Sequence, residues 1–174
     1  MHIWKHFKTI TEHKLLVMQG CFKVGLYKQG LLHDLSKYMP SEFFVGAKYY
    51  QGTRSPNNAE REAKGYSAAW LHHKGRNKHH YEYWVDYSTT QIKGSIPVPM
   101  PTKYIIEMFM DRIAASKVYN KGHYTDSDPL NYYNHGSKYA LMHEDTRAQL
   151  ESLLQMLSNS GETVTFAYIR HMIK

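Results

Sequence analysis

The sequence predicts an all-α protein with one helical domain over residues 1–174. Apolar residues recur at three- and four-residue spacing in most segments, which is the period of a helix with one buried face. Hydrophobic residues make up 42% of the chain, and 174 residues are enough to enclose a core without disulfide or metal staples. Glycine and proline separate many of the periodic segments, where helices are expected to end.

Three helices are expected near the start of the chain, at residues 9 or 11 to 25, 26–38 and 41–52. The first carries an inward stripe that comprises Ile10, His13, Leu16, Val17, Gly20 and Val24. The second closes at Pro40, because proline lacks the N–H that a helix interior needs. The third opens at Ser41 and ends at Gly52.

The middle of the chain is expected to hold further helices at about residues 60–74, 81–85 and 102–118. A loop at residues 55–58 precedes the first of them, and a break at residues 75–77 ends it. Residues 93–101 contain three prolines and cannot form regular helix, because proline removes backbone donors. This segment has room for a short extended piece.

The last third of the chain is expected to form a polar loop at residues 120–128 and helices at about residues 129–142, 145–157 and 163–173. The final two helices have ordinary amphipathic patterns. They carry no cluster of candidate ligands, so we expect them to have a structural role.

Composition limits the compartment and the class of partner. The single cysteine, Cys21, excludes an intrachain disulfide and cysteine-rich zinc modules, and its helical apolar setting predicts a small core residue. The sequence has no signal-peptide pattern and no apolar run near the roughly 20 residues of a membrane span, so we expect a cytoplasmic protein without a membrane partner. The net charge of +7 favours an anionic partner. Because the cations are spread along the chain, a phosphorylated, nucleotide-like small molecule is favoured over nucleic acid as the partner.

Histidine and aspartate recur on or beside the expected helices in an arrangement that suits a metal site. A buried carboxylate needs a cationic partner, and one aspartate can bridge two ions through its two oxygens. Taken singly, an inward histidine such as His13 is more consistent with a core residue bonded to a carbonyl than with a ligand. Asp111 is as consistent with an ion pair to arginine or histidine as with a ligand. Taken together, the candidate side chains favour ligation: they are His13, His33, Asp34, His72, His73, His79, His80 and Asp111.

The order of these residues resembles the HD superfamily of metal-dependent phosphohydrolases and phosphodiesterases. Residues 31–37, Leu-Leu-His-Asp-Leu-Ser-Lys, look like its signature helix. Residues 72–80 are similar to the histidine-rich segment of members that bind two or more metals, and to an uncharacterised branch of small bacterial and phage proteins. The resemblance covers about residues 9–118, which would form the metal-site core, and leaves a C-terminal helical extension at about 129–174. The Gly-Tyr-Pro element of the cyclic-dinucleotide-cleaving subgroup is absent, so the resemblance does not imply that activity.

The resemblance implies a mono- or dinuclear site for divalent Mn, Fe, Zn, Co or Ni. Its first ion would be held by His13, His33, Asp34 and Asp111. Asp34 would bridge to a second ion, held by His73 and by His79 or His80, with the choice between the last two left open. His72 projects about 100° away from His73 on a helix and is not expected to share its ion. Asp34 and Lys37 are the expected catalytic residues, and the expected substrate-binding residues are Lys37, Lys74 and Arg76.

The function expected from this site is hydrolysis of a phosphate ester, of a nucleotide or a related phosphorylated small molecule, by activated water. A di-iron oxygenase on the same fold is an alternative, which coloured, oxygen-sensitive protein would favour. A non-catalytic basic helical module that binds nucleic acid, with a purely structural metal, is a second alternative. Binding that weakens steeply with salt and survives Asp34→Ala would favour that alternative.

Overall fold

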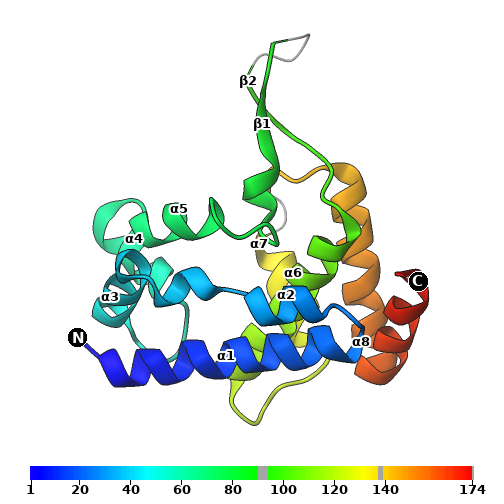
Figure 1. Cartoon of the computed structure of the whole chain (residues 1–174), viewed down its shortest axis with the longest axis horizontal. Helices are drawn as coiled ribbons and strands as arrows, with labels where there is room; N and C mark the ends of the chain where they lie inside the picture. Colours follow the sequence, from blue (N-terminus) through cyan, green and yellow to red (C-terminus); the bar gives the residue numbers. More distant parts are fainter. Residues whose placement is uncertain (90–93, 137–138, 174) are drawn as a thin grey trace.

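Helix α6 (Thr102–Asn120) lies at the centre of the fold, where α1, α2, α7 and α8 all contact it. The computed structural model describes residues 1–89, 94–136 and 139–173, and Figure 1 shows its helices gathered around α6. Every residue from Ile105 to Met110 is buried, so this stretch is enclosed on all sides. The described residues are mostly helical, which confirms the all-α prediction, and the helix expected at residues 102–118 is confirmed as α6.

Helix α1 (Ile3–Lys23) packs along α6 and begins several residues earlier than the sequence predicted. The expected inward stripe is buried, His13 included, except for Leu16, which is half-buried. Gly20 allows the close crossing, because a Cβ there would lie 2.9 Å from Sδ of Met110 on α6. The next residue, Cys21, is fully buried and confirms its predicted place in the core.

The continuous helix expected at residues 26–38 is wrong. Helix α2 ends at Leu32 (Tyr27–Leu32), and a 3₁₀ helix, η1, occupies Leu35–Tyr38. Between them His33 is extended and Asp34 adopts the left-handed conformation, with φ 54° and ψ 24°. Aspartate visits this conformation more readily than most residues. The interruption falls on the two residues that the sequence marks as ligands.

Helices α3 (Pro40–Tyr49) and α4 (Pro56–Lys64) both start at a proline, whose fixed φ suits a first turn. The single helix expected at residues 60–74 is wrong, because α4 ends at Gly65, with φ 80°, and α5 (Ala68–Lys74) follows. Ser67 caps α5 by accepting the backbone N–H of Trp70.

A two-stranded antiparallel sheet follows the 3₁₀ helix η2 (Tyr81–Trp84), which stands where the short aromatic helix was expected. Strands β1 (Val85–Ser88) and β2 (Gly94–Pro97) pair with Val85 opposite Pro97. The hairpin projects from the helices (Figure 1). Strand β2 confirms the extended piece expected at residues 93–101, whereas β1 was not predicted.

The C-terminal helices α7 (Asp128–Gly136) and α8 (Glu144–Met172) share one core with α1 and α6. The two helices expected at residues 145–157 and 163–173 form the two arms of α8, which breaks at Gly161, with φ 77°. Leucines of the first arm, Leu150, Leu153, Leu154 and Leu157, are buried against that core. Among the described helices, none is long and apolar enough to cross a membrane.

Candidate metal centre

Seven side chains from four separate segments converge at α6, and all seven are candidate ligands in the sequence analysis. They form two groups that share Asp34, and within each group the ligand atoms lie within 4.8 Å of one another. The first group is His13, His33, Asp34 and Asp111. The second group is Asp34, His73, His79 and His80.

In the first group, α1 and α6 place His13 and Asp111 face to face. His13 Nε2 lies 2.9 Å from Asp111 Oδ1 and 3.7 Å from Asp34 Oδ2. His33 Nε2 lies 3.3 Å from Asp34 Oδ2 and 3.6 Å from Asp111 Oδ1. Two imidazoles and two carboxylates therefore surround one point between the helices.

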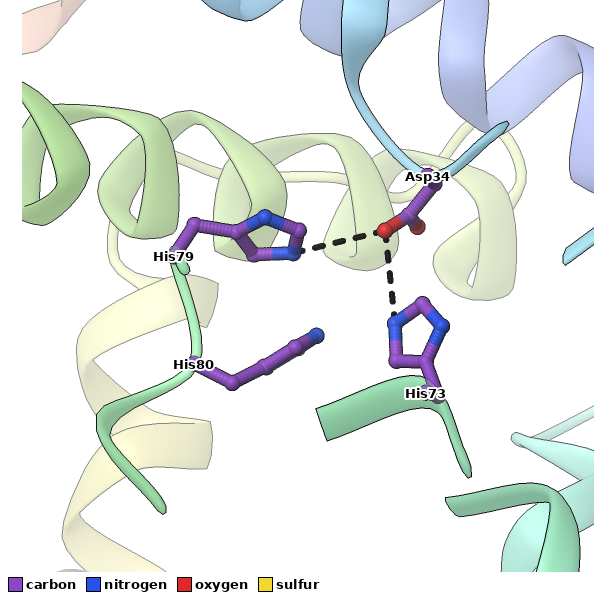
Figure 2. A group of neighbouring side chains, drawn as sticks. All are labelled: Asp34, His73, His79 and His80. Carbon is purple, nitrogen blue, oxygen red and sulfur yellow. Dashed lines mark ion pairs between the residues drawn. The ribbon is translucent and has the colours of Figure 1, made fainter. Parts of the chain in front are cut away.

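In the second group, the other oxygen of Asp34 faces His73 in the last turn of α5 and the histidines that follow this helix. His73 Nε2 lies 3.3 Å and His79 Nε2 lies 3.4 Å from Asp34 Oδ1. His80 points into the space between these two rings, as Figure 2 shows. The structure therefore brings His79 and His80 to the same group, where the sequence left the choice between them open.

The left-handed turn at Asp34 explains how adjacent residues serve one centre. On a regular helix, His33 and Asp34 would diverge by about 100°. The break between α2 and η1 instead lets His33 Nε2 and both oxygens of Asp34 face the same centre. Lys37, on η1, reaches back to Asp34, with its Nζ 2.5 Å from Oδ2.

Two glutamates that the sequence analysis missed support the histidines from behind. Glu107 Oε1 accepts from His33 Nδ1 at 2.9 Å and lies 3.1 Å from His79 Nδ1, so it contacts one histidine of each group. Glu42 Oε2 accepts from His73 Nδ1 at 2.8 Å. A histidine that donates from Nδ1 presents an unprotonated Nε2 to the centre, which is the arrangement of a metal-ligating imidazole.

The remaining polar atoms of the centre lack hydrogen bonds. Nε2 of His33, His79 and His80 and Oδ1 of Asp34 are buried without a hydrogen-bond partner among the described residues, and Asp34 Oδ2 has only its ion pair with Lys37. Buried polar atoms are nearly always satisfied, and Asp34 as an ionised carboxylate would be costly to leave so. Borderline divalent ions bind imidazole nitrogen and carboxylate oxygen, so the donor set fits one ion in each group.

Charge coupling within the centre is strong. Burial would raise the pKa of Asp34, but the charges of His33, Lys37 and His73 hold it well below its usual range. Burial would lower the pKa of His33, but the carboxylates of Asp34, Asp111 and Glu107 raise it well above its usual value. Without an ion, His33 therefore holds a proton between the carboxylates, and an ion must displace it.

A family model described as a family of unknown function (DUF5662) matches residues 2–156. The chain belongs to this family. No curated protein and no solved structure matches the chain significantly. The region matched to DUF5662 contains all seven candidate ligands and ends within α8, so the centre is part of the family's region rather than an addition to it.

A cavity of about 700 Å³ opens beside the centre. Both groups contribute to its wall, and so does Lys37, as the sequence predicted for a substrate-binding residue. Neither Lys74 nor Arg76 is among its lining residues, and exposed Arg76 donates instead to the carbonyl of His72. Arg112, the residue after Asp111 in the sequence, also lines the cavity, and the sequence analysis missed it. Residues of α7 line it too, whereas no residue of α8 does among the described residues.

Proposed function

We propose that the protein is a metal-dependent hydrolase of phosphate esters with a dinuclear His/Asp centre, as the resemblance to the HD superfamily implies. The observation that carries this proposal is Asp34. Both of its oxygens are buried, Oδ2 pairs with the Lys37 ammonium, Oδ1 has no hydrogen-bond partner among the described residues, and each oxygen faces a different group of imidazoles. A carboxylate in this setting is suited to bridging two ions.

The charge of the centre supports an anionic substrate. Four carboxylates lie in the centre or directly behind its histidines: Asp34, Glu42, Glu107 and Asp111. Two divalent ions would balance them, and Lys37 adds a further positive charge at the cavity wall. The metal-loaded centre would therefore attract the negative charge of a phosphoryl group. An apolar or cationic substrate carries no such charge.

When bound, two divalent ions activate a water and neutralise the oxygens of a phosphoryl group. The protein contributes the orientation of that group. The Lys37 ammonium, held beside Asp34, is placed to bind a non-bridging phosphate oxygen. Glu42 and Glu107 fix the rings of His73, His33 and His79. Five imidazoles and two carboxylates favour Mn, Fe, Co, Ni or Zn over calcium, which prefers oxygen ligands alone.

Metal analysis and phosphatase assays on one preparation test the proposal. We expect wild-type protein to retain divalent transition metal after dialysis and to hydrolyse 4-nitrophenyl phosphate or its bis-ester with at least one of the five metals. Asp34→Asn should lose both the metal and the activity, whereas Asp86→Asn, at an exposed site on β1, should keep both. Metal-loaded wild-type protein without turnover on any ester and metal would contradict the proposal.

The imidazole-rich donor set also suits iron, so an oxygenase is the second candidate for the same centre. The two functions separate on the same sample. A hydrolase loaded with Mn or Zn is colourless and cleaves esters under nitrogen. A visible band that changes on exposure to oxygen, in protein that leaves esters intact, would favour the oxygenase.

A further inference from the structure

Two charged side chains outside the metal centre share its cavity, and each has one buried polar atom without a hydrogen bond. Arg112 follows the candidate ligand Asp111 on α6, and Glu82 lies two residues after His80 on η2. Both line the cavity. Arg112 Nε and Glu82 Oε2 are buried without a hydrogen-bond partner among the described residues, as are the polar atoms of the centre itself.

The arginine is held in place by an aromatic ring rather than by an anion. The Arg112 guanidinium lies over the ring of Tyr133, 5.2 Å from its centroid. The Tyr133 hydroxyl donates to Glu151 and accepts from Arg147, which fixes the ring. The other cavity arginines have side-chain partners, since Arg54 pairs with Glu62 and Arg61 donates to Asn58. An arginine fork held in this way is suited to an acceptor on a ligand.

The glutamate lines the same cavity as the arginine without pairing with it. Within the described part of the chain, no ion pair joins Glu82 to Arg112, and neither Glu82 Oε2 nor Arg112 Nε has a hydrogen-bond partner. The cavity wall therefore offers a ligand an acceptor on Glu82 and a donor on Arg112.

From these two unpartnered atoms in one cavity we propose that Arg112 and Glu82 form a subsite for the organic group of the substrate, and that this group carries hydroxyls. A hydroxyl donates to a carboxylate and accepts from a guanidinium, so neighbouring hydroxyls satisfy both side chains. The opposite charges of the subsite suit a group without net charge. The inference rests on the proposed function, in which the phosphoryl group occupies the metal centre, and a cavity of about 700 Å³ leaves room beyond it.

The test compares a hydroxylated ester with one that lacks hydroxyls. D-ribose 5-phosphate and 4-nitrophenyl phosphate are assayed with metal-loaded wild type, Arg112→Met, Glu82→Leu and, as a matched control, Arg54→Met. We expect kcat/KM for the ribose ester to fall about 10- to 100-fold in the first two variants, the range of a lost charged hydrogen bond. The nitrophenyl ester should change little in all variants, and Arg54→Met should affect neither ester. Melting curves check folding, and Arg112→Lys, which keeps charge but not the fork, should be intermediate.

Three outcomes would overturn the subsite. Equal losses on both esters would show that the two residues have a structural role. Unchanged rates on the ribose ester would show that the two side chains bind water and not the substrate. A higher kcat/KM for O-phospho-L-serine than for ribose 5-phosphate would show that the subsite binds an amino acid group instead of hydroxyls. If neither ester is cleaved, hydrolysis fails, but calorimetric titration with ribose 5-phosphate still decides the subsite. Binding that Arg112→Met abolishes and Arg54→Met retains would support it, and absent or unchanged binding would refute it.

Discussion

The two ligand groups that meet at Asp34 are built in different ways. The first group depends on helix packing over a long range, since His13 comes from α1 and Asp111 from α6. The second takes three histidines from the short segment 73–80, where α5 ends. Their donors differ too, because the first group has two imidazoles and two carboxylates and the second has three imidazoles and one carboxylate. One carboxylate thus joins a site made by tertiary packing to a site made by local sequence.

The largest expected effect separates the two groups by removing a ligand from only one of them. Asp111→Asn should lower the metal content from two ions to one and reduce activity by more than about 100-fold, since even outer partners of ligands are worth about 10- to 100-fold. His80→Gln removes a ligand of the second group alone and should also leave one ion. Elemental analysis of the two purified variants measures the number of metal ions bound per chain. If Asp111→Asn keeps two ions, the first group is not a metal site.

A smaller effect is expected from the glutamates behind the histidines, and it should differ between them. Glu107 contacts His33 and His79, one in each group, whereas Glu42 contacts His73 of the second group. Glu107→Gln should weaken both ions about 10- to 100-fold, and Glu42→Gln should weaken only one. Competition with a chromogenic chelator measures both affinities. Equal effects of the two substitutions on both ions would remove the distinction between the groups.

The pH dependence of metal affinity should be alike in the two groups. In each, one imidazole has a raised pKa, His33 in the first and His73 in the second, because neighbouring carboxylates outweigh burial. Asp34 and Asp111 have lowered pKa values and stay ionised in mild acid. Each ion must therefore displace about one proton, and affinity should fall about tenfold per unit as pH drops from about 6.5 to 5. Calorimetry in buffers of different ionisation enthalpy counts the released protons, and a pH-independent affinity would contradict the charge coupling.

The smallest expected effect concerns the local segment that carries the second group. Gly65, with φ 80°, lets α4 end so that α5 can begin, and alanine is strained in that conformation. Gly65→Ala should lower the free energy of unfolding by about 1 kcal/mol. Gly75→Ala is the matched control at the other end of α5, where φ is −74° and a Cβ would lie 3.4 Å from the nearest atom. Urea denaturation of the metal-free protein compares them, and equal stabilities would refute the strain at Gly65.

Much of the candidate centre was predictable because its candidate ligands are His and Asp residues, which stand out on the inward face of a helix. The inward stripe of α1 carried His13, and the apolar run of α6 carried Asp111. Glu107 was also within reach of sequence reasoning, because it precedes Asp111 by four residues and therefore shares its face. Glu42 had no comparable signal, since its partner His73 lies 31 residues away.

The predictions that were wrong depended on tertiary structure. The helical pattern continues through residues 26–38, yet Asp34 leaves the helix in a conformation that serves the centre. The apolar pattern also crosses Gly65, where the chain turns. Strand β1 forms only by pairing with β2, and η2 before it has the aromatic composition expected of a helix. Local propensity is a weak prior when long-range contacts decide the backbone.

Anomalous X-ray scattering from crystals grown with Mn²⁺ tests the central claim most directly. Two peaks should appear beside α6, one next to each oxygen of Asp34, with His13, His33 and Asp111 around one peak and His73, His79 and His80 around the other. Crystals of manganese-soaked protein with no peak at Asp34 would contradict the account.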